Sequence, residues 1–195
     1  MEIFTSWSSW AQAEGPLSEA LPPGTTESLR DAVTFARAQH GVQQRPTGRP
    51  YVEHLLEALE VAVVGAELTD RDVLVAIVLH DVLEDTPCTE ADIARRYGAD
   101  VAELVRWVTR PHGVAKVDYL STLVRAPLHA VFVKLADRVS NVQELQRMPW
   151  RFQRRYYLET VAYIMPLAGA HPWFARWFGE WRTRWHPRAE RLSAY

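Results

Sequence analysis

The sequence predicts an all-α fold. From residue 26 onward, apolar residues recur three and four positions apart, which is the spacing of one face of a helix. Proline and glycine interrupt this pattern at intervals that suit separate helices joined by short loops. The most apolar run, residues 73–79, has no alternating strands around it, so we interpret it as a buried helix.

In the first half of the chain, capping residues mark where helices begin and end. Thr26 suits an N-cap, and prolines and a glycine break the loop 41–50. Asp70 caps the apolar helix, Thr89 begins a capping-box-like segment, and Gly98 ends it. The helices expected here span residues 26–40, 52–66, 70–85, 89–97 and 101–109.

In the second half, prolines set the boundaries. Residues 110–116 read as a loop, Pro127 begins a long helix, and Pro149 separates it from the next one, which Pro166 bends near its end. The helices expected here span residues 118–125, 127–147, 151–168 and 171–185.

Three regions follow from this pattern. Residues 1–25 are rich in proline and glycine and are expected to be an irregular extension, with at most a helical turn near residues 7–13. Residues 26–170 form the main helical domain. Residues 171–195 are expected to be a Trp/Arg-rich helix, packed on the domain or forming an interface with a second copy or a toxin partner. Its aromatic stripe is Trp173, Trp177, Trp181 and Trp185.

Composition excludes several classes of protein. With 195 residues, 48% hydrophobic positions and a net charge of −2, the chain is neither disordered nor strongly basic, so nucleic-acid binding is not expected. Cys88 is the single cysteine, and the N-terminus lacks a signal-peptide pattern. The longest apolar run is far shorter than the roughly 20 residues needed to span a membrane. These features predict a cytoplasmic protein.

Four side chains are candidate ligands of a metal ion. His54, His80, Asp81 and Asp137 each lie in or beside an apolar helical segment. Imidazole and carboxylate groups together suit a divalent first-row ion such as manganese, iron or zinc. The alternative for each histidine alone is a hydrogen-bonded core residue. An Asp beside a His can also simply cap the end of a helix.

Glu84 and Asp85 add a second pair of carboxylates. Glu84 follows His80 by four residues, so a continuous helix places it on the same face. Such carboxylates can orient or deprotonate a water at a metal ion. The alternative is a solvated acidic end of the helix.

Taken together, these motifs resemble the HD-domain phosphohydrolases, and more narrowly the hydrolase domain of the RelA/SpoT alarmone enzymes. The pattern H…HD…D is matched by His54, His80-Asp81 and Asp137. The string HDVLEDT and the string KLADRVSN strengthen the resemblance, as does the late segment that contains ET and PLA. The agreeing segments are residues 45–54, 79–86, 97–102, 108–109, 133–141, 153–155 and 159–168.

The resemblance implies an HD-domain helical bundle with a central metal site, usually Mn²⁺. It implies removal of the 3′-pyrophosphate from guanosine tetra- or pentaphosphate, or the adenosine analogue, by a stand-alone hydrolase. His54, His80, Asp81 and Asp137 would hold the ion, and Glu84 and Asp85 would activate the attacking water. The purine nucleotide would be bound by Arg45, Thr47, Asn141 and Arg154.

Two departures and two rival functions remain open. Pro46 stands where the family usually has lysine, which bears on affinity and base preference, and Leu55 stands where proline is common. One rival is a phosphatase acting on another nucleotide such as NADPH. The other is a non-catalytic antitoxin or sensor that binds a partner, such as an alarmone synthetase, through the Trp-rich helix.

Overall fold

The computed structural model describes residues 1–192, and its side chains are described through residue 185. The described chain is helical, and its β pairing is limited to one isolated bridge between Gln44 and Pro50. None of these helices has the length and apolar character needed to cross a membrane. The α-helices are α1 (Trp10–Ala20), α2 (Thr25–His40), α3 (Tyr51–Glu60), α4 (Arg71–Leu79), α5 (Val82–Asp85), α6 (Glu90–Tyr97), α7 (Ala99–Val108), α8 (Lys116–Thr122), α9 (Leu128–Val142), α10 (Trp150–Glu159) and α11 (Pro172–Leu192).

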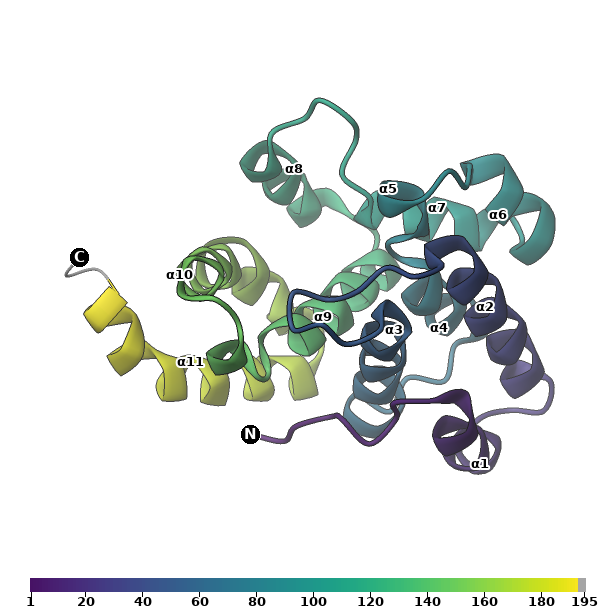
Figure 1. Cartoon of the computed structure of the whole chain (residues 1–195), viewed down its shortest axis with the longest axis horizontal. Helices are drawn as coiled ribbons and strands as arrows, with labels where there is room; N and C mark the ends of the chain where they lie inside the picture. Colours follow the sequence, from purple (N-terminus) through teal and green to yellow (C-terminus); the bar gives the residue numbers. More distant parts are fainter. Residues whose placement is uncertain (193–195) are drawn as a thin grey trace.

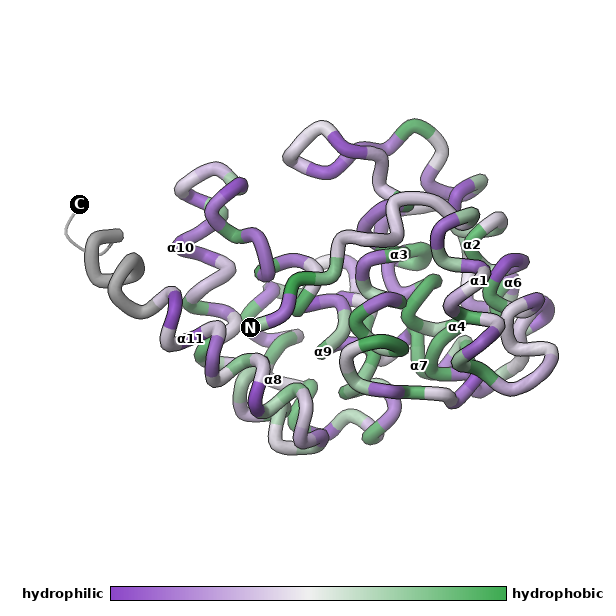
Figure 2. The backbone as a smooth tube through the Cα atoms, turned by 90° about the horizontal axis from the view of Figure 1, so that it is seen from below, coloured by the Kyte–Doolittle hydropathy of each residue, from purple (hydrophilic) through white to green (hydrophobic). Residues whose placement is uncertain are grey.

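Helices α4 and α9 form the centre of the molecule. Every residue from Val73 to Leu79 in α4 is buried, and α4 packs against α2, α3, α7 and α9. Helix α9 lies between this group and the pair α10 and α11 (Figure 1). Hydrophobic residues gather where α3, α4 and α7 meet (Figure 2). The prediction of an all-α bundle is confirmed, and the apolar run is a helix.

Several expected helices end in turns of different pitch. Helix α3 continues as a π-helical turn, Val61–Gly65, and α10 continues as Thr160–Ile164, also π-helical. The segment after α10 ends as the 3₁₀ helix Met165–Ala170, because Pro166 has no N–H with which to continue an α-helix. Helices α8 and α9 are likewise followed by short 3₁₀ turns, Leu123–Arg125 and Leu145–Arg147.

The N-terminal extension is not irregular as expected, because residues 10–20 form α1. Gln12 accepts hydrogen bonds from the backbone N–H groups of Ser8 and Ser9, which closes the start of the helix. Ala13 and Leu17 are fully buried and face the bundle. Pro16 lies on the exposed side, so the carbonyl group that loses its helical partner is on the solvent side. Packing therefore outweighs the cost of the proline.

The expected helix over residues 70–85 is broken at the histidine–aspartate pair. Helix α4 ends at Leu79, and Asp81 has φ −101° and ψ −4°, outside the usual helical values. Adjacent side chains on an unbroken α-helix diverge by about 100°. At this break the two side chains nevertheless meet, with Asp81 Oδ2 at 2.9 Å from His80 Nε2.

The tryptophan stripe of α11 is buried within the chain. Trp181 is fully buried, and its indole N–H donates to the Val142 carbonyl at 3.0 Å. Trp177 donates to the Glu2 carbonyl, also at 3.0 Å, and Trp185 is 1% exposed. Of the two expected alternatives, packing on the domain is the one that the described residues show, because the bundle and the N-terminal segment cover these rings. The buried rings give no support to an interface with a second copy or a toxin. Residues 193–195 of the expected C-terminal region lie outside the described residues.

Trp181→Ala is expected to lower the free energy of unfolding by about 3–5 kcal/mol, the usual cost of emptying a buried aromatic site. The lost hydrogen bond to Val142 adds to this cost. Denaturant unfolding of the variant beside Arg182→Ala, which changes an exposed neighbour on the same helix, measures the difference. Equal midpoints for the two variants would show that α11 does not stabilise the bundle.

Candidate metal centre

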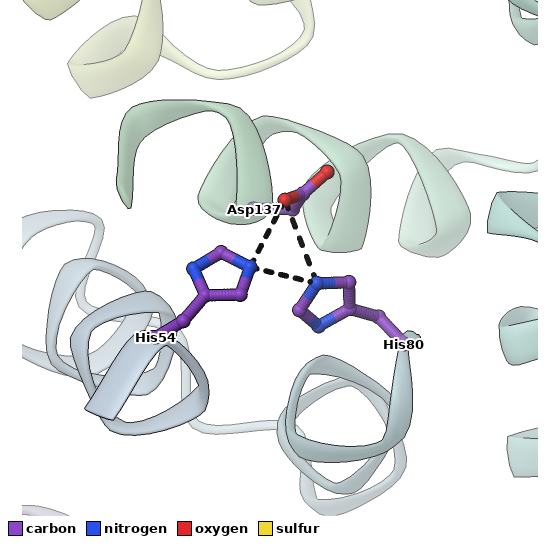
Figure 3. A group of neighbouring side chains, drawn as sticks. All are labelled: His54, His80 and Asp137. Carbon is purple, nitrogen blue, oxygen red and sulfur yellow. Dashed lines mark hydrogen bonds and ion pairs between the residues drawn. The ribbon is translucent and has the colours of Figure 1, made fainter. Parts of the chain in front are cut away.

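Three helices each bring one side chain to a single point. His54 lies in the first turn of α3, His80 directly follows α4, and Asp137 lies in α9 (Figure 3). The two Nε2 atoms are 3.1 Å apart, and Asp137 Oδ1 lies 3.4 Å from the first and 3.5 Å from the second. All three residues are buried, so the group is a compact set of donor atoms in the interior.

Asp81 lies beside the same point. Its Oδ2 atom is 2.9 Å from His80 Nε2 and 3.7 Å from His54 Nε2. The same oxygen accepts a hydrogen bond from the Tyr51 hydroxyl, which holds the carboxylate in place. With Asp81 included, the structure brings together all four residues predicted to hold a metal ion.

His54, His80 and Asp137 each also make a hydrogen bond or ion pair through an atom that does not face the centre, and these contacts fix their orientation. His80 Nδ1 donates to the Ile77 carbonyl at 2.7 Å, so its Nε2 faces the centre. His54 Nδ1 lies 2.8 Å from the Ser140 hydroxyl. Asp137 pairs with Lys134 at 2.8 Å and accepts a hydrogen bond from Asn141.

The charges around the centre require a cation. Burial by itself lowers the pKa of His80, but the carboxylates of Asp81 and Asp137 outweigh burial and raise that pKa well above its usual value. Burial lowers the pKa of His54. The pKa of Asp137 is held well below normal although burial opposes this, because Lys134 and the histidines lie beside it. A proton on His80 or a divalent ion supplies the missing positive charge.

The donor set fits a divalent first-row ion. Bonds from such an ion to imidazole nitrogen or carboxylate oxygen are about 2.1 Å long, which places neighbouring ligand atoms about 3.0–3.4 Å apart. The separations that involve the two imidazole Nε2 atoms run from 2.9 to 3.7 Å. Imidazole with carboxylate is a set typical of manganese, iron and zinc.

A polar cavity of about 180 Å³ opens beside the centre. Glu84 and Asp85 lie at its wall, as do the phenol of Tyr51 and four cationic side chains. Arg110 holds Glu84 in place, since its backbone and guanidinium N–H groups both donate to that carboxylate. Partial burial and the nearby charge of Asp81 raise the pKa of Asp85. The cationic residues are Arg110, Lys116, Lys134 and Arg138.

A second cavity, of about 310 Å³, shares Asn141 with the first. Arg45 and Thr47 line it from the loop before α3, and Arg147 lines it from beyond α9. Three of the four residues predicted to bind substrate therefore gather around this cavity.

Arg154 does not join the other predicted substrate residues. It is exposed on α10 and lines neither of these two cavities. The side of α10 that faces the first cavity carries Tyr156, and a residue two positions earlier points about 200° away around the helix. Arg138 of α9 supplies a cation at that wall instead.

Sequence reasoning missed the cationic residues of the first cavity. Lys134 and Arg138 lie within the KLADR string, and their spacing to Asp137 was a usable indication. Arg110 comes from the loop between α7 and α8, and Lys116 is the first residue of α8. Nothing in the local pattern of this segment shows that it folds over the metal centre. Their contribution depends on tertiary structure.

Comparisons with known proteins agree with this geometry. A family model described as an HD domain matches residues 32–173. A guanosine-3′,5′-bis(diphosphate) 3′-pyrophosphohydrolase of Aquifex aeolicus is 35% identical over 75% of this chain and 22% of its own length. The bifunctional (p)ppGpp synthase/hydrolase SpoT of Escherichia coli is also 35% identical, over 76% of this chain and 22% of its own. The chain thus spans about a fifth of the length of these relatives.

Two smaller relatives are covered more fully. The guanosine-3′,5′-bis(diphosphate) 3′-pyrophosphohydrolase MESH1 of Drosophila melanogaster is 34% identical over 60% of this chain and 68% of its own length. A solved structure of a metazoan orthologue of SpoT that hydrolyses ppGpp superposes with a TM-score of 0.74 and 26% identity. That likeness covers 84% of this chain and 96% of the other.

His80→Ala and Asp137→Ala are each expected to abolish tight binding of a divalent ion while the helical fold survives. Each removes a ligand and leaves the apolar core of α4 and α9 in place. Calorimetric titration with Mn²⁺ and Zn²⁺, beside far-ultraviolet circular dichroism, measures both properties. His129→Ala, which changes an exposed histidine on α9, is the control. Wild-type affinity in either ligand variant would refute the metal centre.

Proposed function

We propose that this chain, which belongs to the HD-domain family, is a metal-dependent hydrolase that removes the 3′-pyrophosphate from guanosine tetra- and pentaphosphate. The observation that carries the proposal is the junction of the metal centre with a cavity whose wall holds both carboxylates and cations. Carboxylates suit activation of water, and cations suit the charge of a substrate that carries two diphosphate groups. The names of the relatives supply the substrate class.

We propose Mn²⁺ as the ion, held by His54, His80, Asp81 and Asp137. When bound, a divalent ion polarises a phosphoryl oxygen and makes a nearby water more acidic. The two neutral imidazoles and two carboxylates suit this ion because it accepts both nitrogen and oxygen ligands.

Glu84 is proposed as the group that takes the proton from the attacking water. The water oxygen forms a bond to the phosphorus attached to the ribose 3′ oxygen, and the bond between that phosphorus and the 3′ oxygen breaks. Pyrophosphate leaves, and the 3′ oxygen ends as a hydroxyl. Asp85, whose pKa is raised by partial burial and by Asp81, shares the orientation of the water. Arg110 supports the role of Glu84 by fixing its carboxylate at the cavity wall.

The nucleoside is proposed to occupy the cavity lined by Arg45, Thr47 and Asn141. Arg45 suits stacking on the base because its guanidinium is planar, and Asn141 suits contact with the sugar because it lies between the two cavities. Arg154 is proposed only as an outlying cation for phosphate charge. With Pro46 in place of a lysine, the loop offers one cation fewer, so we expect weaker substrate affinity than a lysine would give.

Purified protein is expected to release pyrophosphate from guanosine tetraphosphate with Mn²⁺ present and to lose this activity with chelator. The adenosine analogue and NADPH are assayed in parallel to rank the substrates. Orthophosphate from NADPH alone would move the substrate away from alarmones. No turnover of any of the three compounds by protein that binds Mn²⁺ would overturn the proposed reaction.

Glu84→Gln is expected to lower kcat by about 10²- to 10⁴-fold, the usual contribution of a general base. The Mn²⁺ affinity is expected to stay within twofold of wild type, because Glu84 is not one of the four ligands. Steady-state kinetics and calorimetry on the same preparation separate the two effects. Glu90→Gln, an exposed carboxylate nearby in sequence, is the control. A kcat equal to wild type would remove Glu84 from the role of base.

A further inference from the structure

A buried carboxylate outside the metal centre connects two parts of the site. The Glu57 side chain is 3% exposed and lies one helical turn after His54 in α3. Its Oε2 atom accepts from Arg45 Nη1 at 2.6 Å and from the Ser140 hydroxyl at 2.8 Å. Its Oε1 atom accepts from Arg49 Nη1 at 3.2 Å. A buried carboxylate that accepts from two guanidinium groups and a hydroxyl is held in one orientation.

The direction of the hydrogen bonds around Ser140 follows from this charge. A carboxylate can only accept, so the single hydroxyl hydrogen of Ser140 points to Glu57. The serine oxygen then has only lone pairs left for His54 Nδ1, which lies 2.8 Å away. His54 must therefore carry its proton on Nδ1, and its Nε2 lone pair faces the metal centre.

We propose that Glu57 and Ser140 are positioning residues that set the tautomer of the metal ligand His54. The opposite tautomer would put a hydrogen on Nε2, where the ion has to bind. Metal ligands usually receive such support from a carboxylate or carbonyl in direct contact. Here the support passes through a serine hydroxyl.

The same carboxylate ties the metal centre to the substrate loop. Arg45 and Arg49 lie at the two ends of a tight turn, where the Arg45 N–H donates to the Arg49 carbonyl at 2.8 Å. Both guanidinium groups end on Glu57, and both residues line the proposed nucleoside cavity. The buried carboxylate of Glu57 thus fixes both the orientation of the metal ligand His54 and the position of the loop that carries Arg45 and Arg49. This second part rests on the proposed function, whereas the tautomer does not.

The tautomer is tested first on the wild-type protein. Two-bond ¹H–¹⁵N correlation spectra of histidine-labelled, metal-free protein distinguish a proton on Nδ1 from one on Nε2, and His54→Gln identifies the His54 signals. We expect His54 to be protonated on Nδ1. A proton on Nε2 would overturn the proposal. This measurement needs no substrate and no ion, so it stands apart from the proposed reaction.

The affinity for the metal ion then tests whether Glu57 acts on His54 through Ser140. Ser140→Ala and Glu57→Gln are each expected to weaken Mn²⁺ binding by about 10- to 100-fold, the range found when the outer partner of a metal ligand is lost. The double variant is expected to be little worse than either single variant, because both act through one path. Calorimetric titration at fixed pH gives the dissociation constants.

Gln143→Ala is the matched control. Gln143 also reaches Glu57, at 3.4 Å, and it binds the backbone of Phe4, but its hydrogen bonds do not include one to His54. We expect this variant to lose stability and to bind Mn²⁺ within about twofold of wild type. If Ser140→Ala binds Mn²⁺ with wild-type affinity, or if Ser140→Ala and Gln143→Ala lose equal Mn²⁺ affinity, Ser140 does not pass the effect of Glu57 to His54 and the proposal is refuted. If Glu57→Gln alone raises the KM for substrate as well, the link to the substrate loop is supported.

Discussion

The structure is organised around one costly arrangement, in which two imidazole nitrogens and a carboxylate oxygen face one another in the interior. His54 and His80 approach to 3.1 Å, and Asp137 completes the group. Burying such atoms without positive charge is unfavourable. The relative positions of α3, α4 and α9 must therefore be fixed, so that one cation can contact all three side chains at once.

The packing of the surrounding core fixes these relative positions. Helix α4 is buried from Val73 to Leu79, and α3 and α9 pack against it, so none of the three can shift without disturbing the core. Hydrogen bonds to the outer atoms of the ligands then remove the remaining freedom of each side chain. The break after Leu79 lies at this arrangement, since the two adjacent residues that follow it, His80 and Asp81, place their side chains beside the same point.

The two ends of the chain reinforce the same centre from outside. Phe4 exchanges two hydrogen bonds with Gln143, which in turn reaches Glu57. On the other side, Trp181 of α11 donates to the end of α9. Segments that looked like appendages are thus packed onto the helix that carries Asp137, which explains why the tryptophans are inside rather than on a binding surface.

The amino-acid sequence by itself determined the helical class, most helix boundaries and the four candidate metal ligands, because periodicity, capping residues and the spacing of His and Asp are local properties. It misjudged residues 10–20, where burial of Ala13 and Leu17 overrides a proline. The role of Arg154 at phosphate charge stays a prediction, and Arg138 is the cation that lines the cavity on that side. Tertiary structure alone decided that Arg110 of the loop after α7 and Lys116 of α8 reach the cavity, and that Glu57 lies behind Ser140. Both depend on contacts between residues far apart in the chain. For Glu57 and Ser140, the packing of α3 against α9 brings the two residues together.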